Sequence, residues 1–115
     1  MPREIYLVSR EPMTLPVLVE AAAGVEGSLV PRLINGGAAI QLVDLADVAV
    51  LTLDTSRLIR DTVDLERITG PLPTAGEVWW TEATAPWTPA GETGVAVARA
   101  LASLLQARCT VEDGR

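Results

Sequence analysis

The chain has 115 residues, a formal net charge of −6 at pH 7, and neither His nor Lys. This length corresponds to one domain over residues 1–115, large enough to fold around its own core without disulfides or a structural metal. Because it has no imidazole, no amine side chain and one thiol, Cys109, the chain cannot build a Ser–His or Cys–His pair, a lysine Schiff base or a His/Cys zinc site.

Charge and cysteine content restrict the partners and the compartment. All nine basic side chains are Arg and are interspersed among 15 Asp and Glu residues, whereas a nucleic-acid-binding domain presents a basic face and anionic lipid repels an acidic one. No uncharged apolar stretch reaches the about 20 residues of a membrane span. We therefore expect no nucleic-acid partner, no membrane partner and a cytoplasmic location. An Arg-for-Lys bias with abundant Ala, Val and Leu is typical of GC-rich bacterial genomes.

The N-terminal half predicts one strand, one helix and three further strands. Residues 4–9 read as a short strand, and Thr14 is a candidate N-cap for an apolar helix over 15–23. The turn-forming residues 35–37 (Asn-Gly-Gly) and 44–47 then separate three apolar runs. We expect these runs to form an antiparallel meander of strands, over residues 29–34, 38–43 and 48–53.

The C-terminal half predicts a strand and the longest helix. Residues 57–69 fit a helix, with a strand as the open alternative, and residues 77–83 read as a strand. Thr88 and the following Pro start an amphipathic helix that runs to about Arg108. Residues 110–115 are expected to be frayed. The apolar stripe of the helix consists of Val95, Ala98, Leu101, Ala102 and Leu105.

These elements predict an α+β fold. We expect one antiparallel sheet of four to five strands, with the N-terminal helix and the long C-terminal helix packed on it. Val43 and the run 48–53 are too apolar for a face in water, so the sheet is expected to be covered. Pro31 cannot donate to a strand ladder, which places its strand at an edge of the sheet.

Three Trp residues, Trp79, Trp80 and Trp87, are the candidate partner-binding residues. Adjacent residues on a strand point to opposite faces, so Trp79 and Trp80 cannot both enter a one-sided core. Trp is enriched at binding hot spots because it buries a large area and keeps one N–H donor. We expect Trp80→Ala or Trp87→Ala to weaken association while leaving the fold intact. The competing explanation is that one Trp fills a core that has no Phe.

Asp44, Asp47 and Asp54 are the weaker candidate site, for a metal ion. Carboxylate oxygens are the ligands that hard cations such as Mg²⁺ prefer. Each of these residues also stands where a turn or a helix cap would place an Asp, which explains them without a metal. No sequence motif assigns any residue a catalytic role or a bound cofactor.

Two classes of function remain, beside a third possibility that the chain is one subunit of a larger assembly and has no activity alone. The first is a small, acidic, non-catalytic protein-interaction module, partner-binding, chaperone-like or immunity-like, that forms a homodimer. It is favoured by the missing catalytic residue types and by a hydrophobic fraction of 49%. The alternative is a carboxylate-dependent enzyme or small-ligand-binding domain, with Mg²⁺ as the candidate ion. That alternative requires a cleft that gathers two or more of Asp44, Asp47, Asp54, Glu77 and Glu82.

Overall fold

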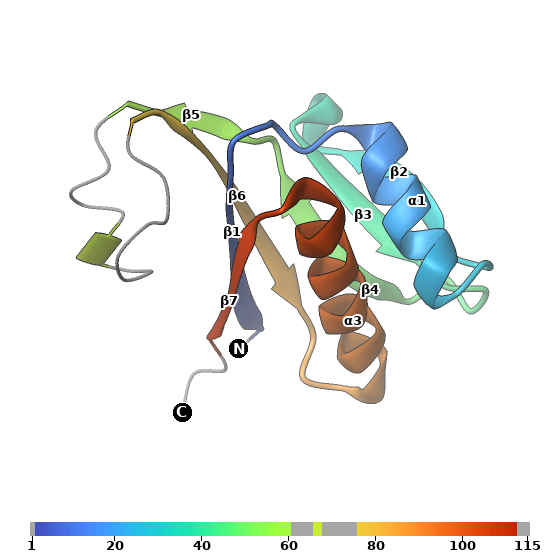
Figure 1. Cartoon of the computed structure of the whole chain (residues 1–115). Coiled ribbons are helices and arrows are strands. Elements are labelled where there is room, and N and C mark those ends of the chain that lie inside the picture. The colour runs from blue at the N-terminus through green and yellow to red at the C-terminus, as the bar shows by residue number, and fades with distance from the viewer. Residues whose placement is uncertain (1, 61–65, 68–75, 113–115) are drawn as a thin grey trace.

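A computed structural model of the protein describes residues 2–60, 66–67 and 76–112. These residues form one antiparallel sheet of seven strands and two α-helices, so the expected α+β class is correct (Figure 1). A short 3-10 turn, Asn35–Gly37, joins the second and third strands. In chain order the elements are β1 (Arg3–Ser9), α1 (Leu15–Val25), β2 (Val30–Ile34), β3 (Ala39–Val43), β4 (Ala49–Asp54), β5 (Arg57–Ile59), β6 (Val78–Ala85), α3 (Pro89–Leu105) and β7 (Arg108–Glu112).

The expected count of four to five strands is wrong. The five expected strands match β1, β2, β3, β4 and β6, but β5 and β7 were missed. β5 falls inside the range 57–69, where a helix was expected and a strand was left open. Residues 66 and 67 of that range are helical, and most of the range lies outside the described residues. Both missed strands are short, and each is stabilised by hydrogen bonds to a partner strand distant in the sequence, β6 for β5 and β1 for β7.

Every strand pairing is antiparallel, in the order β2-β3-β4-β6-β1-β7. β5 also pairs with β6, so that β4 and β5 run one after the other along the same neighbour. β2 and β7 are the two edges. Pro31 therefore lies on an edge strand, as its missing N–H requires.

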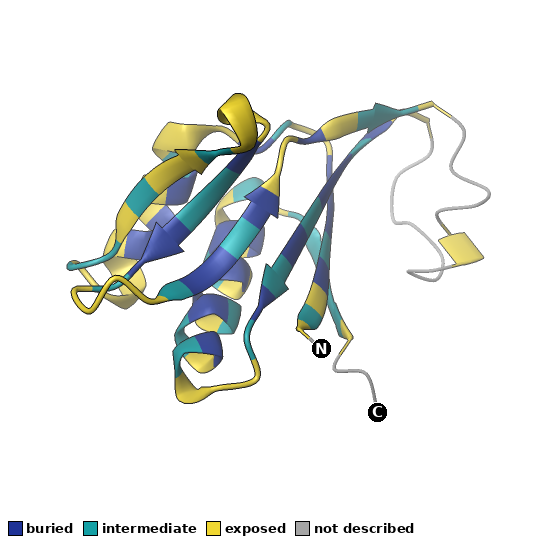
Figure 2. Cartoon of the chain, turned by 180° about the vertical axis from the view of Figure 1, so that it is seen from behind, coloured by how far each residue is buried: buried dark blue, intermediate teal, exposed yellow. Residues whose placement is uncertain are grey.

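Both helices cover the same face of the sheet (Figures 1 and 2). α1 and α3 contact each other, and their apolar sides meet alternate side chains of the strands. Thr14 and Thr88 occupy the N-cap positions as expected, although neither hydroxyl makes a capping hydrogen bond. The main core includes Ile5, Leu7, Leu18, Leu42, Leu51, Leu53, Val97, Ala98, Leu101 and Ala102.

Helix α3 approaches the sheet so closely that one position must be Gly. A Cβ atom at Gly94 would lie 1.8 Å from the carbonyl oxygen of Val50 in β4. The backbones of helix and strand are therefore in direct contact, which any side chain at this position would prevent.

Helix α3 ends at Leu105 rather than near Arg108. Gln106 adopts a left-handed conformation with φ 52° and ψ 41°, and the amide of Ala107 donates to the carbonyl of Ala102 at 2.8 Å. This reversal turns the chain back so that β7 adds to the free side of β1. Residues 108–112, expected as a helix end and a frayed tail, are instead a strand. In the part of the chain that the structure describes, no helix is long and apolar enough to cross a membrane.

Candidate partner-binding face of the sheet

The helices leave one face of the sheet uncovered, which Figure 2 shows with both helices behind it. Side chains alternate between the two faces along each strand, so the register identifies those that point away from the helices. We give the name open face to the part of this surface that β1, β4, β5, β6 and β7 form. It consists of Glu4, Tyr6, Val8, Thr52, Asp54, Arg57, Ile59, Val78, Trp80, Glu82, Thr84, Arg108, Thr110 and Glu112.

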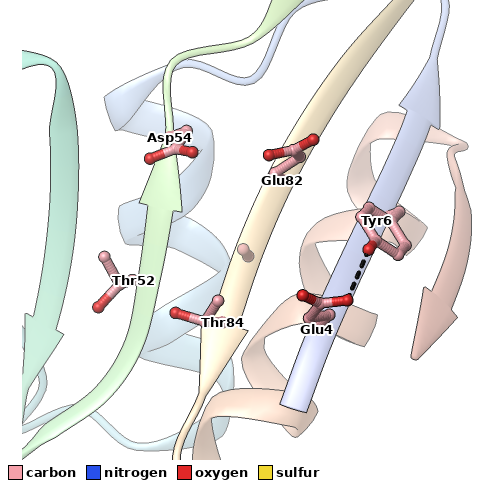
Figure 3. Close-up of a pocket in the computed structure, with 7 residues that line it drawn as sticks. Glu4, Tyr6, Thr52, Asp54, Glu82 and Thr84 are labelled. Atoms are coloured by element: carbon pink, nitrogen blue, oxygen red, sulfur yellow. Dashed lines mark hydrogen bonds between the residues drawn. The ribbon is translucent and has the colours of Figure 1, made fainter. Parts of the chain in front are cut away.

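A pocket of about 210 Å³ lies on the open face between β4, β6 and β1. Figure 3 shows the carboxylates of Asp54, Glu82 and Glu4 on these three neighbouring strands. Hydroxyl groups from the same strands complete the polar lining. The lining residues are Glu4, Tyr6, Thr52, Asp54, Glu82, Ala83 and Thr84.

The pocket forms where the ladder between β4 and β6 is interrupted. The register runs from Thr52–Thr84 to Leu53–Ala83 and resumes, one residue out of step, at Arg57–Trp80. Three residues, 54–56, therefore stand opposite two, 81–82. An extra residue of this kind is a β-bulge, which bends the strand and redirects side chains. Asp54 thus lies at the pocket, while Ser56 is buried and hydrogen-bonds to Thr81.

An aromatic pair lies beside the pocket. Tyr6 stacks on Trp80 with 4.8 Å between ring centroids. The pair joins a small apolar cluster with Val8, Val78 and Ile59, separate from the main core. Trp80 is only 5% exposed, although no helix covers it. The open face therefore has a packed apolar part next to its acidic part.

Hydrogen bonds orient two of the three carboxylates. The hydroxyl of Tyr6 donates to Oε2 of Glu4 at 2.8 Å. Oε1 of Glu82 accepts from Nε1 of Trp80 at 2.9 Å and from the guanidinium of Arg57 at 3.1 Å. Asp54 is exposed and makes no side-chain hydrogen bond or ion pair with the described residues.

The phenol of Tyr6 stays neutral at physiological pH. Burial, followed by the hydrogen bond to Glu4 and the charges of Glu4, Glu112 and Glu82, raises its pKa to about 12. A phenol with this pKa is a hydrogen-bond donor near neutral pH and a poor general base or nucleophile. Tyr6 thus contributes a hydrogen-bond donor to the lining of the pocket.

The three candidate Trp residues do not gather in one place. Trp79 is half-buried on the opposite face of β6 from Trp80. Trp87 follows the other end of β6, is 37% exposed, and lies under the guanidinium of Arg3 at 4.8 Å from that group's central carbon. Arg3 also pairs with Glu92 at the start of α3. Of the three, only Trp80 belongs to the open face. Its burial conflicts with the expectation that Trp80→Ala leaves the fold intact.

The three candidate metal ligands are also separated. Asp44 and Asp47 lie in the turn between β3 and β4, while Asp54 lies at the far end of β4. Oδ1 of Asp44 accepts hydrogen bonds from the amides of Ala46 and Val48, and Asp47 pairs with Arg32 at 3.0 Å. These are the turn roles that explain such residues without a metal. Among the described residues, no three acidic or Cys side chains could together hold a metal ion.

The ligand-binding alternative requires a cleft that gathers at least two of five acidic residues, and one pocket does so. Of the five acidic residues named for it, Asp54 and Glu82 line the same pocket. Glu77 instead pairs with Arg60 at 3.4 Å, in the β5–β6 region.

Sequence reasoning missed Glu4, Tyr6, Thr52 and Thr84. The alternation of a strand places residues 4 and 6 on one face and residues 82 and 84 on one face, and this much can be seen in the sequence. The pattern does not reveal that β1 and β6 are neighbours, because they are separated by more than 60 residues. Comparisons of the chain with protein-family models, with curated proteins and with solved structures find no match.

Proposed function

We propose that this protein is a non-catalytic interaction module that binds a partner protein through the open face. The observation that carries the proposal is the one-sided packing: α1 and α3 cover one face of the sheet, and the other presents a pocket beside a stacked aromatic pair. A sheet face formed by side chains from five strands offers a broad docking surface. The strand ladder fixes the backbone that carries these side chains before a partner arrives, which lowers the entropic cost of binding.

The chemistry of the open face supports recognition rather than catalysis. The groups that line the pocket are carboxylates, hydroxyls and one alanine. The pKa of the Tyr6 hydroxyl is raised to about 12, and Glu82 is engaged by both Arg57 and Trp80. Such groups donate or accept hydrogen bonds in a fixed geometry, as a partner-binding surface requires.

A small-ligand-binding role is the second candidate, favoured by the shared pocket of Asp54 and Glu82. A ligand that binds only the folded state raises the melting temperature. Raised melting with a small cation or metabolite, together with loss of that effect in Asp54→Asn, would favour this role over protein binding.

A steric block of the open face tests the proposal. Thr84 is half-exposed and lines the pocket, so Thr84→Trp would fill the surface without changing the charge. The matched control is Ala96→Trp, at an exposed position of α3. In the test, tagged protein captures its partner from an extract of the native host. We expect Thr84→Trp to lose a partner that Ala96→Trp retains, with both variants melting as cooperatively as the parent. Equal capture by both variants would contradict the proposal.

The cytoplasmic location and the homodimer stay predictions. Several large apolar side chains are exposed on α1 and on the edge strand β2, and a second copy could cover them. Light scattering coupled to size-exclusion chromatography, over a range of concentrations, measures the native mass and decides between monomer and dimer. These exposed side chains are Leu15, Val19, Val30 and Leu33.

A further inference from the structure

We infer that the occupant of the open face is a positively charged segment of a partner protein, which places an Arg or Lys side chain in the pocket between Glu4, Asp54 and Glu82. This inference rests on the proposed function and names the chemical class of the partner. Three features of the face carry it: its charge, its unused acceptors and the size of its pocket.

The charge around the pocket is negative. Three carboxylates line it, and the lining residues include no basic side chain. Arg57 pairs with Glu82 from the rim, which leaves Glu4 and Asp54 without a cationic partner among the described residues. Arg32 lies on β2, which β3 separates from β4, and it is held by Asp47 and Gln41. The net charge of −6 adds a longer-range field that attracts cations and repels anions.

The pocket also offers hydrogen-bond acceptors without donors. Among the described residues, Oε1 of Glu4, Oε2 of Glu82 and both carboxylate oxygens of Asp54 accept no hydrogen bond. In Figure 3 these carboxylates stand on adjacent strands around the same space. A guanidinium carries five N–H donors and an ammonium three, and neither carries an acceptor. The donor set of an Arg or Lys side chain is therefore the complement of this pocket.

The size of the pocket favours a side chain over a free organic molecule. Sites for small molecules usually enclose about 300–1,000 Å³, whereas this pocket has about 210 Å³. A single side-chain head group suits that volume, while the rest of the partner segment would lie over the sheet. Tyr6 lines the pocket, and Arg side chains also bind to aromatic surfaces.

The test uses two blocked peptides of equal length and shape. One contains three Arg residues, and in the other each Arg is replaced by citrulline, its neutral isostere. Each is titrated into the full chain, with backbone amide shifts followed by NMR. We expect the Arg peptide to shift the amides of Glu4, Asp54, Glu82 and Thr84, more weakly as salt is added. The citrulline peptide is expected to leave them unchanged.

Matched charge variants separate the pocket from the general acidity of the protein. Asp54→Asn removes one negative charge in the pocket, and Glu20→Gln removes one on α1, behind the sheet. We expect Asp54→Asn to weaken binding of the Arg peptide about fivefold, which corresponds to about 1 kcal/mol, and Glu20→Gln to leave it unchanged. Equal binding by the two variants, or equal binding of the two peptides, would overturn the inference.

The outcomes also distinguish this inference from the proposed function. If the Arg peptide does not bind but Thr84→Trp loses the host partner, the open face binds a partner that is not cationic. If the Arg peptide binds as expected while Thr84→Trp keeps its host partner, the cation pocket stands and the broader proposal falls. If the Arg peptide does not bind and Thr84→Trp keeps its partner, both proposals are wrong.

Discussion

The indole of Trp80 stacks on the phenol of Tyr6, with 4.8 Å between the ring centroids and 25° between the ring planes. Tyr6 stands opposite Glu82 and Trp80 opposite Val8, so the two rings meet diagonally across β1 and β6. The same two residues donate hydrogen bonds to the carboxylates of the pocket, Tyr6 to Glu4 and Trp80 to Glu82. The stack thus links the packing of the open face to the orientation of its charges.

Removing the two Trp side chains at the ends of β6 should have different effects on stability. Trp80 is 5% exposed, so we expect Trp80→Ala to lower the free energy of unfolding by about 3–5 kcal/mol. Trp87 is 37% exposed and contacts Arg3, so Trp87→Ala should cost about 1 kcal/mol. Urea unfolding followed by circular dichroism measures both. Equal losses would show that Trp80 is not the anchor of the open-face cluster.

The single Tyr of the chain, Tyr6, should ionise at a higher pH than an exposed Tyr. Its pKa of about 12 in the folded protein lies above the ordinary value of 10.0. Burial of the phenol is the largest cause, and the nearby carboxylates raise the pKa further. The folded state thus holds the proton more tightly than the unfolded state. Stability from this group is full below pH 10 and is lost as the pH rises towards 12. The ultraviolet absorbance of tyrosinate follows the ionisation directly.

Glu4→Gln is the control for this titration. It removes the carboxylate that both accepts the Tyr6 hydrogen bond and repels the phenolate, so the pKa of Tyr6 should fall towards 10. A folded parent protein whose Tyr ionises at about 10 would contradict the buried, carboxylate-facing position of Tyr6.

Two Gly→Ala substitutions should act in opposite directions. At Gly94 the new Cβ would lie 1.8 Å from the carbonyl oxygen of Val50, so α3 must move off the sheet, at a cost of about 2 kcal/mol or more. At Gly24, near the end of α1, nothing lies within 4 Å of the new Cβ. Gly24→Ala should therefore stabilise the helix, by up to about 1 kcal/mol. Thermal unfolding of the two variants compares them, and a neutral Gly94→Ala would place α3 farther from β4.

We expect Asp44 to stabilise the turn between β3 and β4 and not to bind a metal ion. Asp44→Ala removes the acceptor for the amides of Ala46 and Val48, and we expect a loss of about 1 kcal/mol. Millimolar Mg²⁺, Mn²⁺ or Ca²⁺ should leave the melting temperature of the parent and the variant unchanged. A rise in the parent that disappears in Asp44→Ala would instead support a metal role for this turn.

A buried hydrogen-bond chain should couple the β1–α1 connection to the bulge. The hydroxyl of Ser56 accepts from the amide of Met13 at 2.9 Å and lies 2.6 Å from the hydroxyl of Thr81. Ser56→Ala leaves both groups without this partner and should cost about 1–3 kcal/mol. Thr81→Val should lower the free energy of unfolding less in the Ser56→Ala variant than in the parent protein, because in that variant the Thr81 hydroxyl has already lost its Ser56 partner. Strictly additive losses in urea unfolding would show that the two hydroxyls do not interact.

The sequence by itself determined the elements whose signal is local. The alternation of residues 4–9, the turn at 35–37 and the start of α3 at Thr88 each depend on neighbours within a few positions. Tertiary structure alone decided that β1 lies between β6 and β7, because strand pairing joins residues far apart in the chain and local pattern carries no partner identity. β5 and β7 became strands through those pairings. The pocket likewise exists only because the fold brings Glu4 beside residues 52–54 and 82–84, and a bulge in one ladder opens the space between them.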